Sequence, residues 1–368
     1  MTPQFTVFYD EADVGLSSSG NVNDPILRKR LIISALKDTS FSIQLIPSSP
    51  TEDLTAILKV HNADYLQFLK NVYQSWKDEG SIEDFLAGDC IGIIPYTFPS
   101  EKARCRFLSS KNKNKLPFIF QIGLFASDTI TPIYSYTYNL AISSVNLALK
   151  SLDVLLEQPV GSIVFSMTTF PGHHCCHDKY AGYCFLNNAA ITATSALDKN
   201  QSVALIDLDY HAGDGTRELL EGLDNVLVTS IHADPICEYP FFSCYDEESC
   251  GNVIVRTLPP HSTIDNYLIV LKSLLVTISE FNPDLFIISF GSDTVIGDTD
   301  RTNGFGLDLE IQDYITIGEV IGSRISSRVL VLSEGGYRMD AVGEVTRNFL
   351  NGLENSRKVS INCDKENG

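Results

Sequence analysis

VALIDLDYHAGDGT, residues 203–216, joins an apolar run to a segment rich in ionisable side chains. The run VALID does not alternate apolar and polar residues, which predicts a strand that is buried on both faces of a parallel sheet. Asp209 and His211 follow it two positions apart, and in an extended segment both side chains point the same way. The stretch therefore predicts a core strand that delivers polar side chains at its carboxyl end.

Six other short runs have the same unalternated, β-branched character: FTVFY near residue 5, SIQLI near 42, SIVFS near 162, NVLVTSI near 225, LFIISF near 285 and VLVLS near 329. Longer stretches with helical spacing lie between them: residues 64–76, 143–156, 187–197, 267–281 and 312–322. Strands that alternate with helices predict a wound, mostly parallel sheet with helices on both sides.

The chain of 368 residues is expected to form one α/β domain over residues 1–354. Residues 78–137 show no clear period and include the polar stretch SSKNKNKLP, so they are interpreted as a rim or insertion segment. The last residues, 355–368, are interpreted as a flexible tail.

Composition narrows the class of protein. The 46 acidic and 27 basic residues give a net charge of −19, which disfavours binding to nucleic acid. This charge suits a cationic substrate or simply a solubilising surface. No apolar run of about 18 residues predicts a membrane span, and the first residues do not resemble a secretory signal. The nine scattered cysteines are expected to be reduced, and the cytoplasm is the expected compartment.

Polar residues follow several of the predicted strands, and the carboxyl ends of parallel strands share one edge where ligands bind. Asp293 follows LFIISF there, as Asp209 and His211 follow VALID. Two carboxylates and one imidazole would neutralise a divalent cation and leave positions open for water and substrate. Such ligands suit zinc, but also Fe(II), Co or Mn. From the D-x-H pattern alone, a polar loop after a strand is the favoured interpretation. Together with Asp293 at the end of a neighbouring strand, the metal site becomes the favoured one.

PGHHCCHDKY, residues 171–180, follows the predicted strand near residue 162. His173 and His174 in this turn could shuttle protons, or could be two hydrogen-bonded core histidines. Asp207 and Asp214 flank the predicted metal ligands, and each could orient one imidazole.

Together these stretches resemble the arginase-like deacetylase superfamily, which includes histone deacetylases and acetylpolyamine amidohydrolases. The matching stretches occur in family order: residues 59–69, 171–193, 204–216, 230–235, 289–298, 304–314 and 332–337. The segments YAGYCFLNNAA and SIHADP are most similar to the acetylpolyamine branch. The resemblance implies a single domain with an eight-stranded sheet sandwiched by helices, the arginase/deacetylase fold.

The resemblance also implies roles for single residues. A metal, usually zinc, would be held by Asp209, His211 and Asp293. The tandem catalytic histidines would be His173 and His174, with His174 as general base and with carboxylate partners Asp207 and Asp214. Tyr337 would donate a hydrogen bond to the oxyanion as an acetamide is attacked. A potassium ion would lie near Asp207, Asp209, His211 and Ser230.

Tyr183 and Tyr239, together with Gly182, are expected to line a substrate tunnel, although core packing explains either tyrosine equally well. Asp128 matches an acidic rim position. Asp300 falls where a polyamine-preferring branch places an acidic gatekeeper, or it is a solvated surface residue.

The chain also departs from the family pattern. Thr169 and Phe170 replace an arginine and a proline, Ala212 replaces a common second histidine, and the segment PFIFQIG lacks an acidic residue that would bind a polyamine. Cys175 and Cys176 replace small residues and are interpreted as fillers rather than metal ligands or nucleophiles.

Three functions follow from the sequence. The first is a deacetylase of acetylpolyamines or similar small acetylated amines, with a rim closed by residues 78–137 or by a second subunit of a homo-oligomer. The second is a deacetylase of acetyl-lysine peptides, which needs an open rim. The third, a catalytically silent binding module, is disfavoured because the metal ligands, both histidines and Tyr337 are all present.

Overall fold

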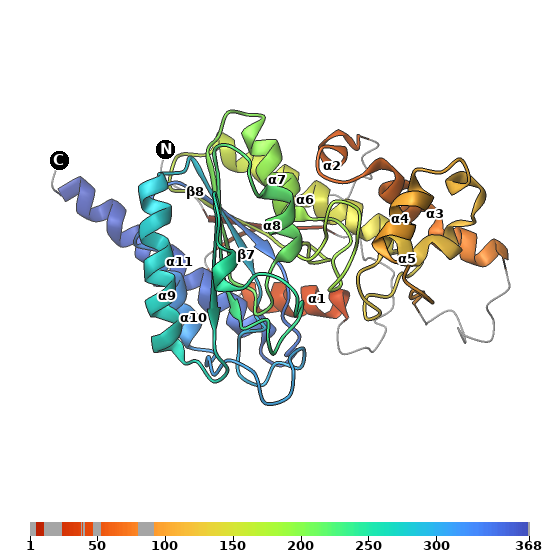
Figure 1. Cartoon of the computed structure of the whole chain (residues 1–368). Helices are drawn as coiled ribbons and strands as arrows, with labels where there is room; N and C mark the ends of the chain where they lie inside the picture. Colours follow the sequence, from red (N-terminus) through yellow and green to blue (C-terminus); the bar gives the residue numbers. More distant parts are fainter. Residues whose placement is uncertain are drawn as a thin grey trace.

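Parallel strands form one central sheet in the computed structural model (Figure 1), which describes residues 5–10, 24–37, 39, 41–46, 53–79 and 92–366. Within these residues the sheet has eight strands in the order β2-β1-β3-β8-β7-β4-β5-β6. The strands are β1 (Phe5–Tyr9), β2 (Ser42–Leu45), β3 (Ile163–Ser166), β4 (Val203–Asp207), β5 (Val226–Ala233), β6 (Val253–Leu258), β7 (Leu285–Phe290) and β8 (Arg328–Ser333). The predicted α/β fold with an eight-stranded sheet is confirmed, and the sheet is parallel throughout.

Position in the sheet explains the composition of each strand. β4 and β7 lie in the middle and are buried at every residue, as expected for strands covered on both faces. The edge strand β2 is largely exposed. The other edge strand, β6, alternates more, and the runs identified in the sequence do not include it.

Helices cover both faces of the sheet (Figure 1). They are α1 (Pro25–Leu36), α2 (Thr55–Leu58), α3 (Ala63–Glu79), α4 (Glu101–Leu108), α5 (Ile122–Phe125), α6 (Thr137–Glu157), α7 (Asn188–Leu197), α8 (Asp214–Leu220), α9 (Ile264–Phe281), α10 (Asp313–Gly322) and α11 (Val342–Glu366). One hydrophobic core lies between the sheet and α1, α9, α10 and α11. The second core, which includes α3, α6 and α7, lies on the opposite face. The sheet is therefore the middle layer of a sandwich.

The segment 78–137 consists of short pieces where the structure describes it. It holds α4, α5 and two short 3-10 turns, η1 (Lys113–Lys115) and η2 (Phe118–Gln121), which agrees with its irregular sequence. Residues 80–91 of this segment lie outside the described residues. In Figure 1, α2 to α5 form a lobe at one end of the sandwich.

The expected tail, residues 355–368, differs from the structure over most of its length. Helix α11 continues to Glu366, and Arg357 is only 6% exposed. The Arg357 guanidinium donates hydrogen bonds to the carbonyl oxygens of Gly161, Ile325 and Ser327. The helix therefore remains anchored to the domain at least as far as Arg357.

One helix within the described residues, α6, is long and apolar enough to cross a membrane by length and composition alone. Its buried side chains include Leu140, Val145, Leu152 and Leu155, which belong to the core on one face of the sheet. These contacts are those of a core helix.

Candidate active site

The ends of β3, β4, β7 and β8 bring distant parts of the sequence to one edge of the sheet. Because all four strands run in parallel, the segments that follow them meet at the carboxyl edge. These segments carry the tandem histidines after β3, Asp209 and His211 after β4, Asp293 after β7, and Tyr337 after β8. The predicted convergence at one edge is therefore found in the structure.

Asp209, His211 and Asp293 form a buried cluster whose ligand atoms all lie within 4.8 Å of one another. Nδ1 of His211 lies 3.4 Å from Oδ1 of Asp209 and 3.5 Å from Oδ2 of Asp293. Burial disfavours charge on each carboxylate, yet the neighbouring His173 and His211 hold the pKa of Asp209 below its usual range. Burial and the charge of Asp209 raise the pKa of Asp293.

The cluster fits a divalent cation. Oδ2 of Asp293 is buried without a hydrogen-bond partner, whereas a buried carboxylate oxygen normally has one. Two glycines leave space beside the carboxylates, because a Cβ on Gly291 would lie 2.2 Å from Oδ2 of Asp209 and one on Gly335 would lie 2.3 Å from Oδ2 of Asp293. Two carboxylates and an imidazole are also ligands that suit a catalytic metal.

A second buried group, His173, Cys184 and Glu334, has ligand atoms equally close together. Its chemistry differs, because two main-chain amides already bind Oε2 of Glu334. Burial raises the pKa of the Cys184 thiol, which keeps sulfur in its poorly ligating form. This group does not fit a metal as well as the Asp209 cluster.

The tandem histidines each have a carboxylate partner on the side away from the cluster. Nδ1 of His173 donates to Oδ2 of Asp207 at 3.0 Å, and Nδ1 of His174 donates to Oδ1 of Asp214 at 2.8 Å. A carboxylate that accepts from Nδ1 fixes the orientation of the ring and leaves Nε2 facing the opposite side. Both imidazoles can therefore present Nε2 to a reacting group.

The two imidazoles differ in protonation. Burial lowers the pKa of His174 well below its ordinary value, and the positive charges of His173 and His211 lower it further. Burial also disfavours charge on His173, but Asp209 and Asp207 outweigh it and raise the pKa of His173 to about 10. A neutral His174 beside a cationic His173 is the arrangement in which His174 can accept a proton.

Tyr337 lines the same cavity as the two histidines. Burial and the charge of Asp300 raise the pKa of its phenol well above 10, so the hydroxyl keeps its proton and can donate. The Arg28 guanidinium lies 5.7 Å from the centre of its ring, and the Tyr183 ring packs edge-on against it at 5.6 Å. The main-chain amide of Tyr337 donates to Oδ2 of Asp298 at 2.8 Å. The tyrosine is thus held through its ring and its backbone.

A small cavity of about 40 Å³ joins these groups. Its lining residues are Ile130, His173, His174, Gly182, Tyr183, Asp209, His211, Tyr239, Asp293, Asp300, Gly335 and Tyr337. The Tyr239 ring packs edge-on against His174 at 4.7 Å. Gly182 has a φ of 53°, and a Cβ there would lie 2.2 Å from Cδ2 of His174, so a glycine is required where the wall approaches the imidazole.

The two predicted acidic substrate contacts have different positions. Asp300 lies in the cavity wall, where Tyr183 donates a hydrogen bond to its Oδ1 at 3.5 Å. Asp128 does not line the cavity. Its oxygens accept from the amides of Ile130, Thr131 and Gly182 and from the hydroxyls of Thr131 and Tyr239. These donors hold Asp128 against two residues that line the cavity, Gly182 and Tyr239.

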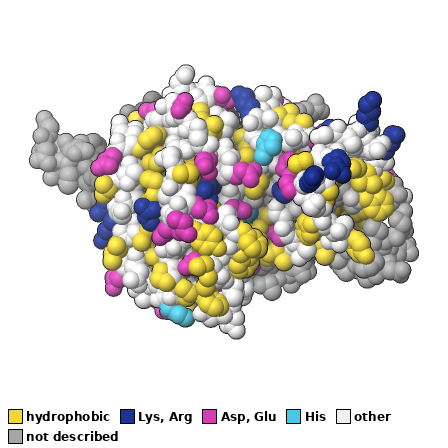
Figure 2. All heavy atoms as spheres, viewed as in Figure 1, with side chains coloured by type: hydrophobic (Ala, Val, Ile, Leu, Met, Phe, Trp, Pro, Cys, Tyr) yellow, Lys and Arg dark blue, Asp and Glu magenta, His cyan; other side chains and the backbone are white. Residues whose placement is uncertain are grey.

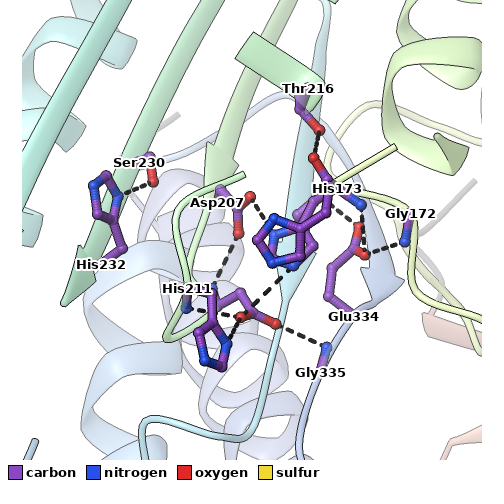
Figure 3. Close-up of polar contacts among 12 residues, drawn as sticks. Gly172, His173, Asp207, His211, Thr216, Ser230, His232, Glu334 and Gly335 are labelled. Carbon is purple, nitrogen blue, oxygen red and sulfur yellow. Dashed lines mark hydrogen bonds and ion pairs between the residues drawn. The ribbon is translucent and has the colours of Figure 1, made fainter. Parts of the chain in front are cut away.

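The residues predicted for potassium include two members of the cluster, Asp209 and His211, together with Asp207 and Ser230. Asp207 and Ser230 are register partners on β4 and β5, and the chain from Asp207 to His211 passes beside them (Figure 3). The Ser230 hydroxyl lies 2.7 Å from Nδ1 of His232. The structure therefore brings Ser230 next to Asp207, as the resemblance implies.

Cys175 and Cys176 lie outside the metal cluster and the cavity wall. Cys175 is fully buried, with its sulfur 3.7 Å from the Tyr65 hydroxyl. Burial raises the pKa of both thiols, which opposes a role as thiolate ligand or nucleophile. All seven cysteines that the structure describes are free.

Three residues that hold this site together had no role predicted from the sequence: Arg28, Asp298 and Glu334. Asp298 and Glu334 stand inside matched motifs, SFGSDTVIGD and LSEGGY, so their position was a usable signal. Arg28 had none, because it lies in α1, far along the chain from every motif.

A larger cavity of about 540 Å³ lies between α3 and residues 108–121. Asp64 and Lys113 on its wall pair with each other at 2.6 Å. No residue of the histidine and aspartate cluster lines it, so the chemistry belongs to the smaller cavity.

Comparisons with known proteins agree with this geometry. Residues 25–353 match the histone deacetylase domain. Acetylpolyamine amidohydrolase 1 of Pseudomonas aeruginosa is 34% identical over 310 residues, which cover 82% of this chain and 83% of that protein. The acetylpolyamine amidohydrolase of Mycoplana ramosa is 30% identical over 335 residues, 89% of this chain and 90% of that protein. The crystal structure of acetylpolyamine aminohydrolase from Burkholderia pseudomallei has the same fold, with a TM-score of 0.81 at 23% identity over 96% of this chain and 99% of that chain.

Proposed function

Because the chain belongs to the histone deacetylase family, we propose that it is a metal-dependent hydrolase that removes the acetyl group from acetylated amines, with acetylated polyamines as its main substrates. The observation that carries this proposal is the shared cavity. One small space is lined by the candidate metal ligands, by both histidines and by the Tyr337 phenol. A cation site, a base and a hydrogen-bond donor around one space are the components that amide hydrolysis needs.

We propose that Asp209, His211 and Asp293 hold a divalent cation, with zinc as the first candidate and Fe(II), Co(II) or Mn(II) as alternatives. When bound, the cation supplies Lewis acidity toward the amide carbonyl and toward water. The cluster is buried and includes an unpaired carboxylate oxygen, which supports a structured site over a chance group of acidic residues.

The residues around the cluster have distinct tasks in this proposal. His174 accepts the proton of the attacking water, since its pKa is the lower of the two imidazoles, and Asp214 holds its ring in place. His173, paired with Asp207, stays cationic and stabilises negative charge. The proton on His174 then passes to the leaving amine.

Tyr337 donates a hydrogen bond from its hydroxyl group to the carbonyl oxygen as that oxygen becomes negative. Its raised pKa keeps this hydrogen available at neutral pH. A donor that is already in place costs little reorganisation when the charge develops. Tyr183, Tyr239 and Gly182 would surround the alkyl chain that leads to the acetamide.

Three features support an acetylated polyamine. Two relatives that share most of this chain's length are named acetylpolyamine amidohydrolases. The Asp300 carboxylate in the cavity wall can meet a second ammonium group. The net charge of −19 favours the approach of a cation.

We also propose a structural potassium ion beside Asp207, Asp209, His211 and Ser230. We further propose that the protein resides in the cytoplasm, which the free cysteines support.

The test compares deacetylation of N-acetylputrescine, N8-acetylspermidine and an acetyl-lysine peptide by the zinc-loaded protein, with a chelated control. We expect the highest kcat/KM for the acetylpolyamines and no turnover after chelation. A higher kcat/KM for the peptide would identify a protein deacetylase. Silence on all three substrates, with or without metal, would identify a binding module.

A single substitution tests the substrate class further. Asp300→Asn is expected to lower kcat/KM for acetylpolyamines by about tenfold, which is the usual scale for one lost ammonium–carboxylate contact. It should leave turnover of an uncharged N-acetyl alkylamine unchanged. The matched control is Asp224→Asn, at an exposed aspartate outside the cavity, and equal effects of the two substitutions would argue against a role for Asp300.

A further inference from the structure

Glu334 is a buried carboxylate next to the histidine turn, and none of the proposed chemical steps uses it. It follows β8 directly and is 0% exposed. Its Oε2 accepts from the main-chain amides of Gly172 at 2.6 Å and His173 at 3.3 Å, and its Oε1 accepts from the Ser289 hydroxyl at 3.0 Å. Figure 3 shows the side chain pointing toward the turn that carries the histidines.

No lysine or arginine among the described residues pairs with the Glu334 carboxylate within 4.0 Å. A buried carboxylate costs free energy, and two kinds of contact offset that cost here. A ring nitrogen of the cationic His173 lies within 4.8 Å of the carboxylate, and the two amides and the hydroxyl donate hydrogen bonds to it. The amides in turn need an acceptor, because they are buried away from water. Glu334 and the turn therefore satisfy each other.

The turn is held from two sides. On one side Glu334 accepts the amide hydrogens of Gly172 and His173; on the other the amide of Thr216 donates to the His173 carbonyl at 2.9 Å. A Cβ on Gly172 would lie 2.5 Å from the amide nitrogen of Asn188, so the turn also packs closely against the start of α7. These contacts leave the His173 backbone little freedom.

The main chain at Glu334 reaches the other parts of the site. Its carbonyl oxygen accepts from Arg28 at 2.6 Å, and Arg28 lies over the Tyr337 ring. The next amide, that of Gly335, donates to Oδ2 of Asp209 at 2.8 Å. The segment Glu334–Gly335 thus contacts the histidine turn, the candidate metal ligand Asp209, and Arg28, which lies over the Tyr337 ring.

We propose that Glu334 is a positioning residue that sets the His173–His174 pair at its working distance from Asp209 and Tyr337. It acts as a hydrogen-bond acceptor of fixed length, and it does not touch the substrate. The inference rests on the proposed function for the reaction being measured, but its structural readout does not depend on any substrate.

The experiment compares two variants of the full-length, metal-loaded protein. Glu334→Asp keeps the charge but shortens the side chain by one methylene group, so the carboxylate no longer reaches the amides of Gly172 and His173. Glu334→Gln keeps the length and one acceptor oxygen for the turn, while its NH2 group can donate to Ser289. The control Ser289→Ala removes only the third donor and leaves both amide contacts.

We expect Glu334→Asp to lower kcat by about 10- to 100-fold, the usual loss when support behind a metal or base is removed, with metal content and KM close to wild type. Glu334→Gln should recover most of the lost kcat, and Ser289→Ala should change it little. In NMR spectra the imidazole proton between His173 and Asp207 should shift in Glu334→Asp and return in Glu334→Gln.

Three results would overturn the proposal. The first is a folded, metallated Glu334→Asp protein with wild-type kcat. The second is an unmoved His173 resonance in that variant. The third is a Glu334→Gln protein as impaired as Glu334→Asp, because the charge and not the acceptor geometry would then matter. If Glu334→Asp does not fold, Ser289→Ala and Glu334→Ala replace it. Wild-type kcat in Ser289→Ala, with low kcat and a shifted His173 signal in Glu334→Ala, supports the proposal. An unshifted His173 signal in Glu334→Ala rejects it. A wild-type protein that turns over no acetylated amine rejects the proposed function, whereas the NMR comparison still tests Glu334.

Discussion

The two carboxylate oxygens of Asp293 distinguish the candidate metal site from an ordinary polar loop. Oδ1 of Asp293 accepts from the Tyr210 amide, while its Oδ2 has no hydrogen-bond partner and faces His211 at 3.5 Å. A protein core rarely leaves a carboxylate oxygen in that state unless an ion or water completes it. This oxygen without a hydrogen-bond partner therefore supports the proposed metal site.

Replacing this carboxylate should remove the metal. We expect Asp293→Ala to retain less than about a tenth of the wild-type metal after dialysis, since one of three protein ligands is lost. Elemental analysis of the dialysed protein measures this directly, and circular dichroism controls for folding. A folded variant with its full metal content would exclude Asp293 from the ligand set.

Tyr337 should matter for turnover and leave metal binding alone. We expect Tyr337→Phe to lower kcat by about 100- to 1,000-fold, the usual effect of removing one oxyanion donor. Metal content and unfolding temperature should stay near wild type, because the ring contacts with Arg28 and Tyr183 remain. Tyr183→Phe, which removes a neighbouring hydroxyl, is the control. Equal kcat values for wild type and Tyr337→Phe would rule out the assigned donor.

At the scale of elements, the sequence predicted every described strand except the edge strand β6, and it predicted the covering helices less completely. Central strands such as β4 are recognisable because every residue is buried and all but the terminal Asp207 are apolar. β6 lies at an edge, and its half-exposed Arg256 and Thr257 interrupt the apolar run. The family, the fold and the similarity to acetylpolyamine amidohydrolases are confirmed.

Helix α1 shows why other elements escape sequence patterns. Its buried face includes Arg28 and Lys29 beside Ile32 and Leu36, so its apolar periodicity is broken by charged residues that serve the site. Lys29 donates to Oδ1 of Asp10 and to the Thr169 hydroxyl. The role of Glu334 was hidden for a related reason, because its partners are main-chain amides 161 and 162 residues away.

Asp298 joins the segments that follow β7 and β8, and this supports a prediction about both. Its Oδ2 accepts from the amides of Tyr337 and Arg338, and its Oδ1 accepts from the amide of Asp300. Asp298→Asn replaces one acceptor oxygen with a donor that cannot bind these amides. We expect a loss of stability of about 1–3 kcal/mol for the unsatisfied amides, together with a lower kcat.

Thermal unfolding and kinetics on a charged and an uncharged acetylated amine measure these effects. The control is Asp308→Asn, an aspartate whose partner is the exposed His261 at 3.3 Å. If Asp298→Asn and Asp308→Asn unfold at the same temperature and have the same kcat, Asp298 does not join the two segments.

At the scale of the whole molecule, the two ends of the sheet have separate tasks. The carboxyl edge carries the site, while α11 secures the opposite edge through Arg357, whose three carbonyl partners precede β3 and β8. Burial lowers the pKa of Arg357 only to about 10, so the guanidinium remains charged at neutral pH. A hydrogen bond from a charged donor contributes about 1.5–3 kcal/mol in such a setting.

Truncation should locate where the domain ends. A chain that stops after Glu354 loses Arg357 and leaves three carbonyl groups without this donor, so it should lose about 2–4 kcal/mol of stability. A chain that stops after Lys358 keeps Arg357 and should unfold close to the full-length temperature. Arg357→Ala in the full chain should reproduce most of the shorter chain's loss. In all three proteins kcat per folded molecule should equal that of the wild type at 25 °C, because the site lies at the other edge of the sheet. If the two truncated chains unfold at the same temperature, the domain ends at residue 354.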